Sequence, residues 1–226
     1  MVGASSTEAL ILDFDGVIVD SMAAKSEAAS AVLSAAGAPI PAETFDREYA
    51  GWRIHESFEA ILEDYGQPTE DVDTLVRRRE EIVAEALSSG GIPLVDGILD
   101  LLEGAARIDV PVVVATGSRR EYAETAIRHH RLDRYLSGLV SAYDSGVERG
   151  KPEPDVFIVA ARSCGANPSN CLAVEDGMPG FLAALRAGMR CYYLAAANRA
   201  DLPEEARDAM DQGRAAIITS LREVAL

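Results

Sequence analysis

The sequence predicts an α/β fold in which an open parallel sheet carries an inserted all-helical domain. Two observations predict the sheet: short apolar segments recur along the chain, and helical patterns lie between most of them. Continuous apolar runs are typical of strands buried on both faces, and their alternation with helices predicts βαβ units. A third observation, a block of helical patterns without strands near the N-terminus, predicts the insertion. We therefore expect a Rossmann-like core with a helical cap domain.

The predicted core elements are spread over the chain in alternation. The strand-like segments are residues 8–13, 110–115, 138–142, 171–175, 190–194 and 215–219. The helical segments between them are residues 97–107, 119–130, 154–165 and 178–187.

The helical block covers residues 21–90 and is rich in Ala and Glu, with Gly and Pro between its segments. We expect a cap of residues 21–95 and a core of residues 1–20 and 96–226, with hinges at Asp20–Met22 and Gly90–Gly97.

Composition limits the partners of this chain. Its 226 residues are 48% apolar, which is enough for a full core. A formal net charge of −16 repels nucleic-acid phosphates and anionic membranes, so we expect neither as a partner. Three cysteines without CxxC spacing, no signal-peptide pattern and no membrane-length apolar run predict a cytoplasmic protein with free thiols. We expect a monomer or a homodimer.

Polar side chains stand at the ends of three predicted strands, where ligands bind in open α/β sheets. Asp13 and Asp15 follow the first strand, and Thr116-Gly117-Ser118 follow the second. Glu175 and Asp176 end the fourth, and Lys151 lies in the segment before it. Parallel strands would bring these groups to one edge of the sheet.

This set of side chains suits phosphoryl transfer. Clustered carboxylates repel one another, and a hard divalent cation such as Mg²⁺ relieves that repulsion. Lys151 adds positive charge for phosphoryl oxygens, while Thr116 and the backbone amide near Gly117 offer hydrogen-bond donors. One of the two aspartates can attack phosphorus, and the other can act as acid and then base.

The segments DFDGVIVDS, ATGS, GKPEPD and EDGMPGFLAALRAGM occur in this order and resemble the four motifs of the haloacid dehalogenase superfamily. The resemblance is closest to the branch with a helical cap, which contains phosphatases and β-phosphoglucomutases. It covers nearly the whole chain, and the core matches better than the cap.

The resemblance implies a role for each matching residue. Asp13 would be the nucleophile, and Asp15 the general acid and base. Thr116, Gly117 and Lys151 would hold the phosphoryl group. The implied magnesium ligands are Asp13, the backbone carbonyl of Asp15, Asp176 and Glu175. The implied activity is hydrolysis of a small phosphorylated metabolite, possibly a sugar phosphate, through an aspartyl-phosphate intermediate.

Three alternatives remain at this point. A phosphomutase like β-phosphoglucomutase would carry a His where Lys25 stands and a Lys where Ala50 stands. A dehalogenase of the superfamily would lack the second acid, which Asp15 supplies here. A non-catalytic member of the fold would have no reason to keep the whole acidic set.

Substrate recognition is assigned to five residues as a hypothesis. For each, a solvated surface position is an equally good interpretation. The candidates are Lys25, Trp52, Arg53, Ser118 and Arg120.

Overall fold

The computed structural model describes residues 7–49 and 54–226. The chain forms two compact units, one of Met1–Asp20 with Leu94–Leu226 and one of Ser21–Pro93. Among the helices of the described residues, none combines the length and the apolar character needed to cross a bilayer.

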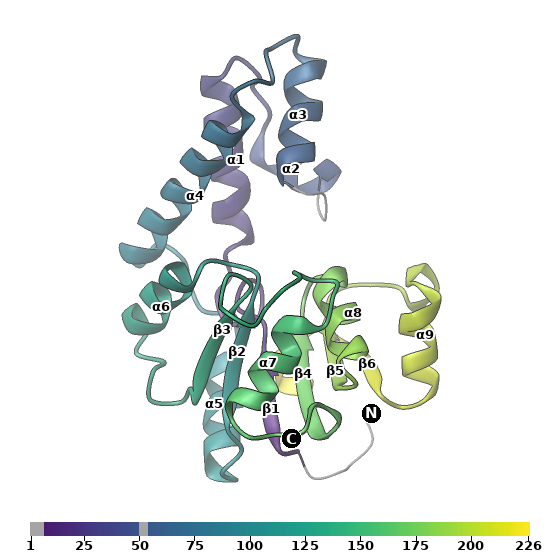
Figure 1. The fold of residues 1–226 in the computed structure, drawn as a ribbon. Helices are drawn as coiled ribbons and strands as arrows, with labels where there is room; N and C mark the ends of the chain where they lie inside the picture. The colour runs from purple at the N-terminus through teal and green to yellow at the C-terminus, as the bar shows by residue number, and fades with distance from the viewer. Residues whose placement is uncertain (1–6, 50–53) are drawn as a thin grey trace. The chain divides into compact units, whose positions relative to one another are not determined.

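The first unit contains a parallel sheet of six strands in the order β3-β2-β1-β4-β5-β6 (Figure 1). This order is typical of Rossmann-like folds and confirms the predicted parallel sheet. The strands are β1 (Ala9–Leu12), β2 (Val112–Thr116), β3 (Gly138–Ser141), β4 (Cys171–Glu175), β5 (Arg190–Leu194) and β6 (Ala215–Ile218).

Helices connect these strands in the way the sequence predicts, with one addition. They are α5 (Ile98–Arg107), α6 (Arg120–His129), α7 (Asp155–Ser163), α8 (Met178–Arg186) and α9 (Glu204–Asp211). Helix α9 was not predicted. It is short and strongly charged, and the signals that mark it are Pro203 at its N-terminus and two glutamates in its first turn.

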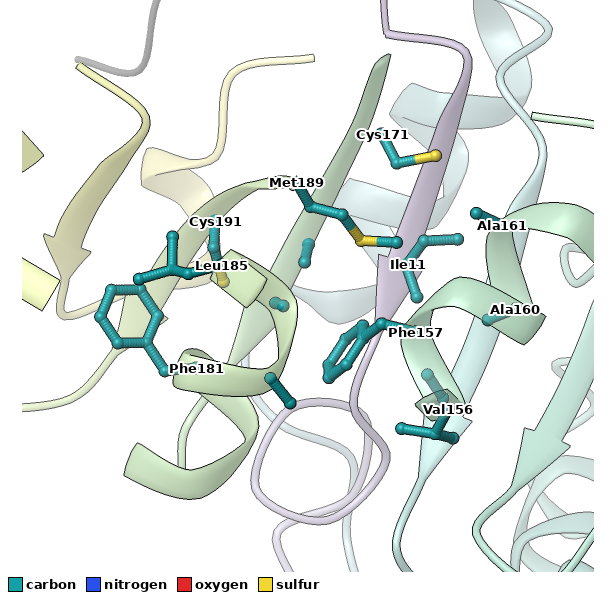
Figure 2. Packing of buried hydrophobic residues seen from close by; sticks show 14 of the residues in the cluster. Ile11, Val156, Phe157, Ala160, Ala161, Cys171, Phe181, Leu185, Met189 and Cys191 are labelled. Atoms are coloured by element: carbon teal, nitrogen blue, oxygen red, sulfur yellow. The ribbon is translucent and has the colours of Figure 1, made fainter. Parts of the chain in front are cut away.

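The sheet is buried on both faces. Helices α7 and α8 cover one face, where Ile11 of β1 packs with Phe157 of α7 and with Met189 (Figures 1 and 2). The residues that alternate with this set along the strands are buried as well, as parallel strands require. They are Leu10, Leu12, Val112, Val114, Leu172 and Val174.

The second unit consists of the helices α1 (Met22–Ala35), α2 (Ala42–Tyr49), α3 (Ile54–Asp64) and α4 (Val72–Ser88). Helix α1 is rich in alanine, the best helix former, and ends at Gly37 with φ +83°. The unit has an apolar core of its own, in which Phe45 meets Phe58 edge to face with ring centroids 6.2 Å apart.

The chain leaves and re-enters the sheet unit at adjacent points. Val19 forms an antiparallel bridge with Leu94, and the N–H of Val95 donates to the carbonyl of Ile18 at 3.0 Å. The helical unit is therefore inserted between two residues that lie side by side.

Helix α5 offers a direct test of the core. Its buried residues Ile98, Leu101, Leu102 and Ala105 recur at helical spacing, and Leu102 is fully buried, whereas Leu99 is 43% exposed. We expect Leu102→Ala to lower the free energy of unfolding by about 2–5 kcal/mol, because it leaves a cavity. Leu99→Ala is the matched control and should cost about 0.5 kcal/mol or less. Urea titration measures both, and equal costs would contradict the assigned packing.

Candidate active site

The carboxyl ends of β1, β2 and β4 meet at one edge of the sheet, because β1 lies between the other two strands. The chain winds toward β3 on one side of β1 and toward β6 on the other, so β1 marks the switch point of the fold. The N–H of Asp13 donates to the Val174 carbonyl at 3.0 Å, which extends the ladder and holds Asp13 beside the end of β4. The sequence predicts a site at this edge, and polar side chains gather there.

Lys151 joins two of these strand ends. Its Nζ lies 2.5 Å from Asp13 Oδ1 and 2.5 Å from Glu175 Oε1. It also lies 5.0 Å from the centroid of the Phe157 ring. Burial opposes the charged ammonium, but the two carboxylates outweigh that effect and raise the pKa of Lys151. The lysine is therefore a fixed positive charge.

A third carboxyl completes the cluster. Oxygen atoms of Asp13, Glu175 and Asp176 lie within 4.8 Å of one another. Burial, and then the neighbouring negative charges, raise the pKa of Asp176 to about 8. Burial is also the main cause that raises the pKa of Glu175 to about 7 and the pKa of Asp13. Lys151 carries one positive charge, which does not offset the two buried carboxyls and the half-buried carboxyl of Asp176.

This donor set fits a hard divalent cation such as Mg²⁺, which prefers carboxylate oxygens. Gly16 supports the fit, because it has φ +79° and a Cβ at its position would lie 1.9 Å from Asp176 Oδ2. A side chain at Gly16 would thus displace one of the carboxylates that could hold the ion.

Glu175 is held from two sides. Its Oε1 accepts from Lys151, and its Oε2 accepts from the N–H of Gly177 at 2.7 Å. The first turn of α8 passes directly over it, since a Cβ at Gly180 would lie 1.6 Å from Oε1. The glycine lets the helix approach the carboxylate closely.

Asp15 has different partners from Asp13. The loop that follows Asp15 closes on itself, with the N–H of Gly16 donating to the Val19 carbonyl at 2.8 Å. The Asp15 carboxylate accepts from Ser118 Oγ at 2.6 Å and from Tyr122 Oη at 3.1 Å. The hydrogen bonds described here differ between the two aspartates, and their expected division of roles stays a prediction. Tyr122 was missed by the sequence analysis.

Thr116 and Gly117 occupy the end of β2. Thr116 is fully buried, and its Oγ1 accepts from the N–H of Ser118 at 2.9 Å. No heavy atom lies within 4 Å of the position that a Cβ would take at Gly117, so the space beside this backbone is open. The phosphate-binding role of both residues stays a prediction.

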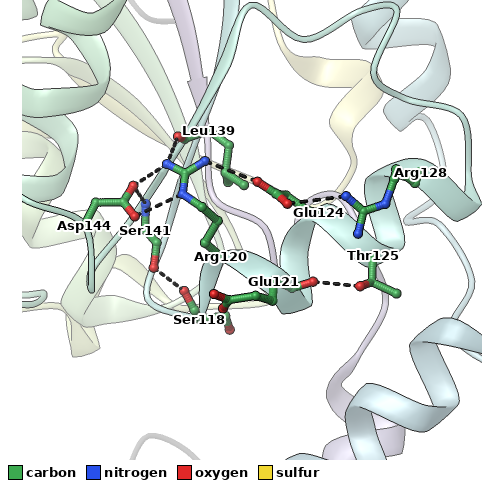
Figure 3. A network of polar contacts seen from close by, with 9 residues as sticks. All are labelled: Ser118, Arg120, Glu121, Glu124, Thr125, Arg128, Leu139, Ser141 and Asp144. Carbon is green, nitrogen blue, oxygen red and sulfur yellow. Dashed lines mark hydrogen bonds and ion pairs between the residues drawn. The ribbon is translucent and has the colours of Figure 1, made fainter.

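Arg120 lies in a structural network (Figure 3). Its guanidinium donates to both carboxylate oxygens of Asp144 and, at 2.7 Å, to the carbonyl of Leu139. A weaker contact of 3.4 Å reaches Glu124. The hydrogen bond to Asp144 raises the pKa of Arg120 and lowers that of Asp144. These contacts tie α6 to the β3 end, and the recognition role of Arg120 stays a prediction.

Three further recognition candidates, Lys25, Trp52 and Arg53, fall in the sequence range of the helical unit. Lys25 lies in α1, and its carbonyl accepts from Arg79 Nε at 3.3 Å. Trp52 and Arg53 lie outside the described residues. The recognition role of all three stays a prediction.

The chain resembles known proteins in both sequence and fold. A family model for haloacid dehalogenase-like hydrolases matches residues 7–188. The chain is 34% identical over 184 residues to a fructose-1-phosphate phosphatase of Escherichia coli, covering 80% of this chain and 92% of that protein. It is 27% identical over 197 residues to a 6-phosphogluconate phosphatase of Escherichia coli, with coverage of 85% and 84%.

Among solved structures, a β-phosphoglucomutase from Clostridium difficile superposes with a TM-score of 0.71. The two sequences are 21% identical, and the superposition covers 97% of this chain and 94% of the mutase chain. This likeness concerns the fold. The predicted fold class, a Rossmann-like parallel sheet with a helical cap, is confirmed.

The contact between Gly180 and Glu175 leads to a prediction. We expect Gly180→Ala to lower the free energy of unfolding by about 1–3 kcal/mol, because the added methyl group collides with a buried carboxylate. Gly104→Ala is the matched control in helix α5, where the nearest atom would lie 3.9 Å from the new Cβ. It should stabilise the protein by about 0.5–1 kcal/mol, since alanine favours the helix. Urea titration measures the free energy of unfolding of both variants. If Gly180→Ala leaves this free energy unchanged, α8 does not approach Glu175 as closely as described.

Proposed function

The chain belongs to the haloacid dehalogenase-like hydrolases, and from this premise we propose that it is a magnesium-dependent phosphatase of a small phosphorylated metabolite. Its curated relatives support a phosphoric monoester hydrolase. The observation that carries the proposal is the buried Lys151 between Asp13 and Glu175, with Asp176 beside them, at the switch point of the sheet.

Asp13 is the proposed nucleophile. One of its oxygens is fixed by Lys151 at 2.5 Å, so the carboxylate has a defined orientation. It attacks phosphorus, the bond from phosphorus to the leaving oxygen breaks, and a phosphoryl group remains on Asp13. Lys151, with Thr116 and the backbone at Gly117, balances the negative charge on the phosphoryl oxygens.

Asp15 is the proposed general acid and base. In the first step it gives its proton to the leaving oxygen, and an alcohol departs. In the second step its carboxylate takes a proton from water as that water attacks phosphorus. The bond from phosphorus to Asp13 then breaks, which releases inorganic phosphate and restores both aspartates. Two residues with separate contacts suit these two tasks.

Asp13, Asp176, Glu175 and the backbone carbonyl of Asp15 are the proposed ligands for Mg²⁺. The ion, when bound, would neutralise negative charge on the carboxylates and the phosphate. The protein's part is to keep two buried acids and the half-buried Asp176 within reach of one ion, and the raised pKa values of Glu175 and Asp176 reflect the cost.

A sugar phosphate is the proposed class of substrate. The relatives at 34% and 27% identity are named for fructose 1-phosphate and for 6-phosphogluconate. A screen of phosphorylated metabolites for phosphate release, with Mg²⁺ present, tests this class. The same screen separates hydrolysis from mutase activity, since a mutase forms an isomer and depends on a bisphosphate activator. The proposed setting is the cytoplasm.

Asp13→Asn tests the nucleophile. We expect it to reduce phosphate release by about 10³-fold or more, because an amide is a poor nucleophile for phosphorus. The fold should survive, as circular dichroism would show. Asp133→Asn is the control, since Asp133 is exposed in the loop between α6 and β3 at the other edge of the sheet. Activity near that of the parent in Asp13→Asn would rule out this residue as the nucleophile.

Metal removal tests the cation. We expect EDTA to abolish phosphate release and Mg²⁺ to restore it. Mg²⁺ should also raise the melting temperature of the protein, because a ligand that binds the folded state stabilises it. Asp176→Asn should weaken this thermal shift, which is a readout independent of catalysis. Full activity in EDTA, or the same thermal shift in Asp176→Asn, would count against the proposed ligands.

A further inference from the structure

The Asp15 carboxylate is held at both of its oxygens, by Ser118 just before α6 and by Tyr122 in the first turn of α6. Ser118 Oγ donates to Oδ2 at 2.6 Å, and Tyr122 Oη donates to Oδ1 at 3.1 Å. Ser118 precedes α6 by two residues and Tyr122 lies in its first turn, so both donors come from one short stretch of chain. Tyr122 lies outside the four motifs, whereas Ser118 is the last residue of ATGS.

Both donors are themselves fixed. The ring of Tyr122 packs edge to face against fully buried Phe14, with centroids 5.7 Å apart and an angle of 79° between the planes. The backbone of Ser118 is held on both sides, because its N–H donates to Thr116 Oγ1 at 2.9 Å and its carbonyl accepts from Ser141 Oγ at 2.7 Å. Ser141 belongs to the network of Figure 3.

We propose that Tyr122 and Ser118 are positioning residues that aim the carboxyl group of Asp15 at the leaving oxygen of the substrate. The inference rests on the proposed function, in which Asp15 is the general acid. It gives Ser118 a role other than the substrate recognition expected for it, because its hydroxyl donates to Asp15.

The physical basis is the geometry of proton transfer. A general acid must lie within hydrogen-bond reach of the oxygen that it protonates, and small errors of placement cost much of its effect. An aspartate has two rotatable side-chain bonds, and two donors that are themselves fixed restrict both of them. Removal of one hydroxyl leaves the carboxyl group free to turn.

Substrates whose leaving groups differ in basicity distinguish a positioning role of Tyr122 and Ser118 from a general contribution to the stability of the fold. An alkoxide is a strong base and needs a proton as it departs, whereas p-nitrophenolate is stable and departs without one. The value of kcat/KM includes only steps up to phosphoryl transfer to Asp13, so it reports the acid step and omits hydrolysis of the intermediate. A misplaced acid should therefore reduce kcat/KM for an alkyl phosphate alone.

The test compares fructose 1-phosphate with p-nitrophenyl phosphate. For Tyr122→Phe, which keeps the ring against Phe14, we expect kcat/KM to fall about tenfold on the sugar phosphate and less than about twofold on the aryl phosphate. Ser118→Ala should show the same selectivity. The matched control is Tyr135→Phe, because Tyr135 Oη donates to Glu103 at 3.3 Å outside the site. It should leave both values unchanged.

Asp15→Asn is the reference variant. It distinguishes a failure of the positioning role from a failure of the proposed function. It should show the largest selective loss, of about 10²-fold or more on the sugar phosphate. If Asp15→Asn is selective while Tyr122→Phe and Ser118→Ala lose nothing, or lose equally on both substrates, the positioning role is overturned and the phosphatase proposal stands. If Asp15→Asn itself shows no selectivity, or the parent enzyme hydrolyses neither substrate, the failure lies with the proposed function.

Discussion

The structure of the site depends on one buried cation, the ammonium of Lys151, which lies between the carboxylates at the ends of β1 and β4. A buried ion pair contributes little to stability unless each charge is well paired, and a buried acid without a partner is strongly unfavourable. Lys151 makes Asp13 and Glu175 tolerable inside the protein, yet Asp176 leaves an excess of negative charge. The proposed magnesium ion would neutralise that excess.

Glycine and hydroxyl groups provide the close spacing that this charge arrangement needs. Gly16 and Gly180 let backbone approach Asp176 and Glu175 more closely than any side chain would allow. On the other side of β1, Ser118 and Tyr122 supply neutral donors to Asp15. The acids are thus divided between two environments, one cationic and one made of hydroxyl groups, which is a physical route to different roles for two aspartates in one motif.

Much of this arrangement follows from the sequence, because the strand ends carry it. Asp13, Thr116 and Glu175 each follow an apolar run, and the parallel order of β1, β2 and β4 brings them together. Tyr122 could not be found in this way. Its contact with Asp15 depends on how the loop after β1 is placed against the first turn of α6, which strand ends alone do not predict. The hydrogen bond between Arg120 and Asp144 could not be predicted for a similar reason, because Asp144 lies 24 residues away in a loop with no regular pattern. Helix α9 was not predicted because it is short and has few apolar positions.

The antiparallel bridge between Val19 and Leu94 has a consequence for how such a protein diversifies. The segment between these two residues is an insertion that leaves the sheet unit and returns to it at the same place. Its length and sequence can change through evolution without moving a strand, because the bridge fixes the anchor points. The reaction centre and the inserted helices are thereby open to separate selection, and a family built on this plan can gain new substrates while its chemistry stays constant.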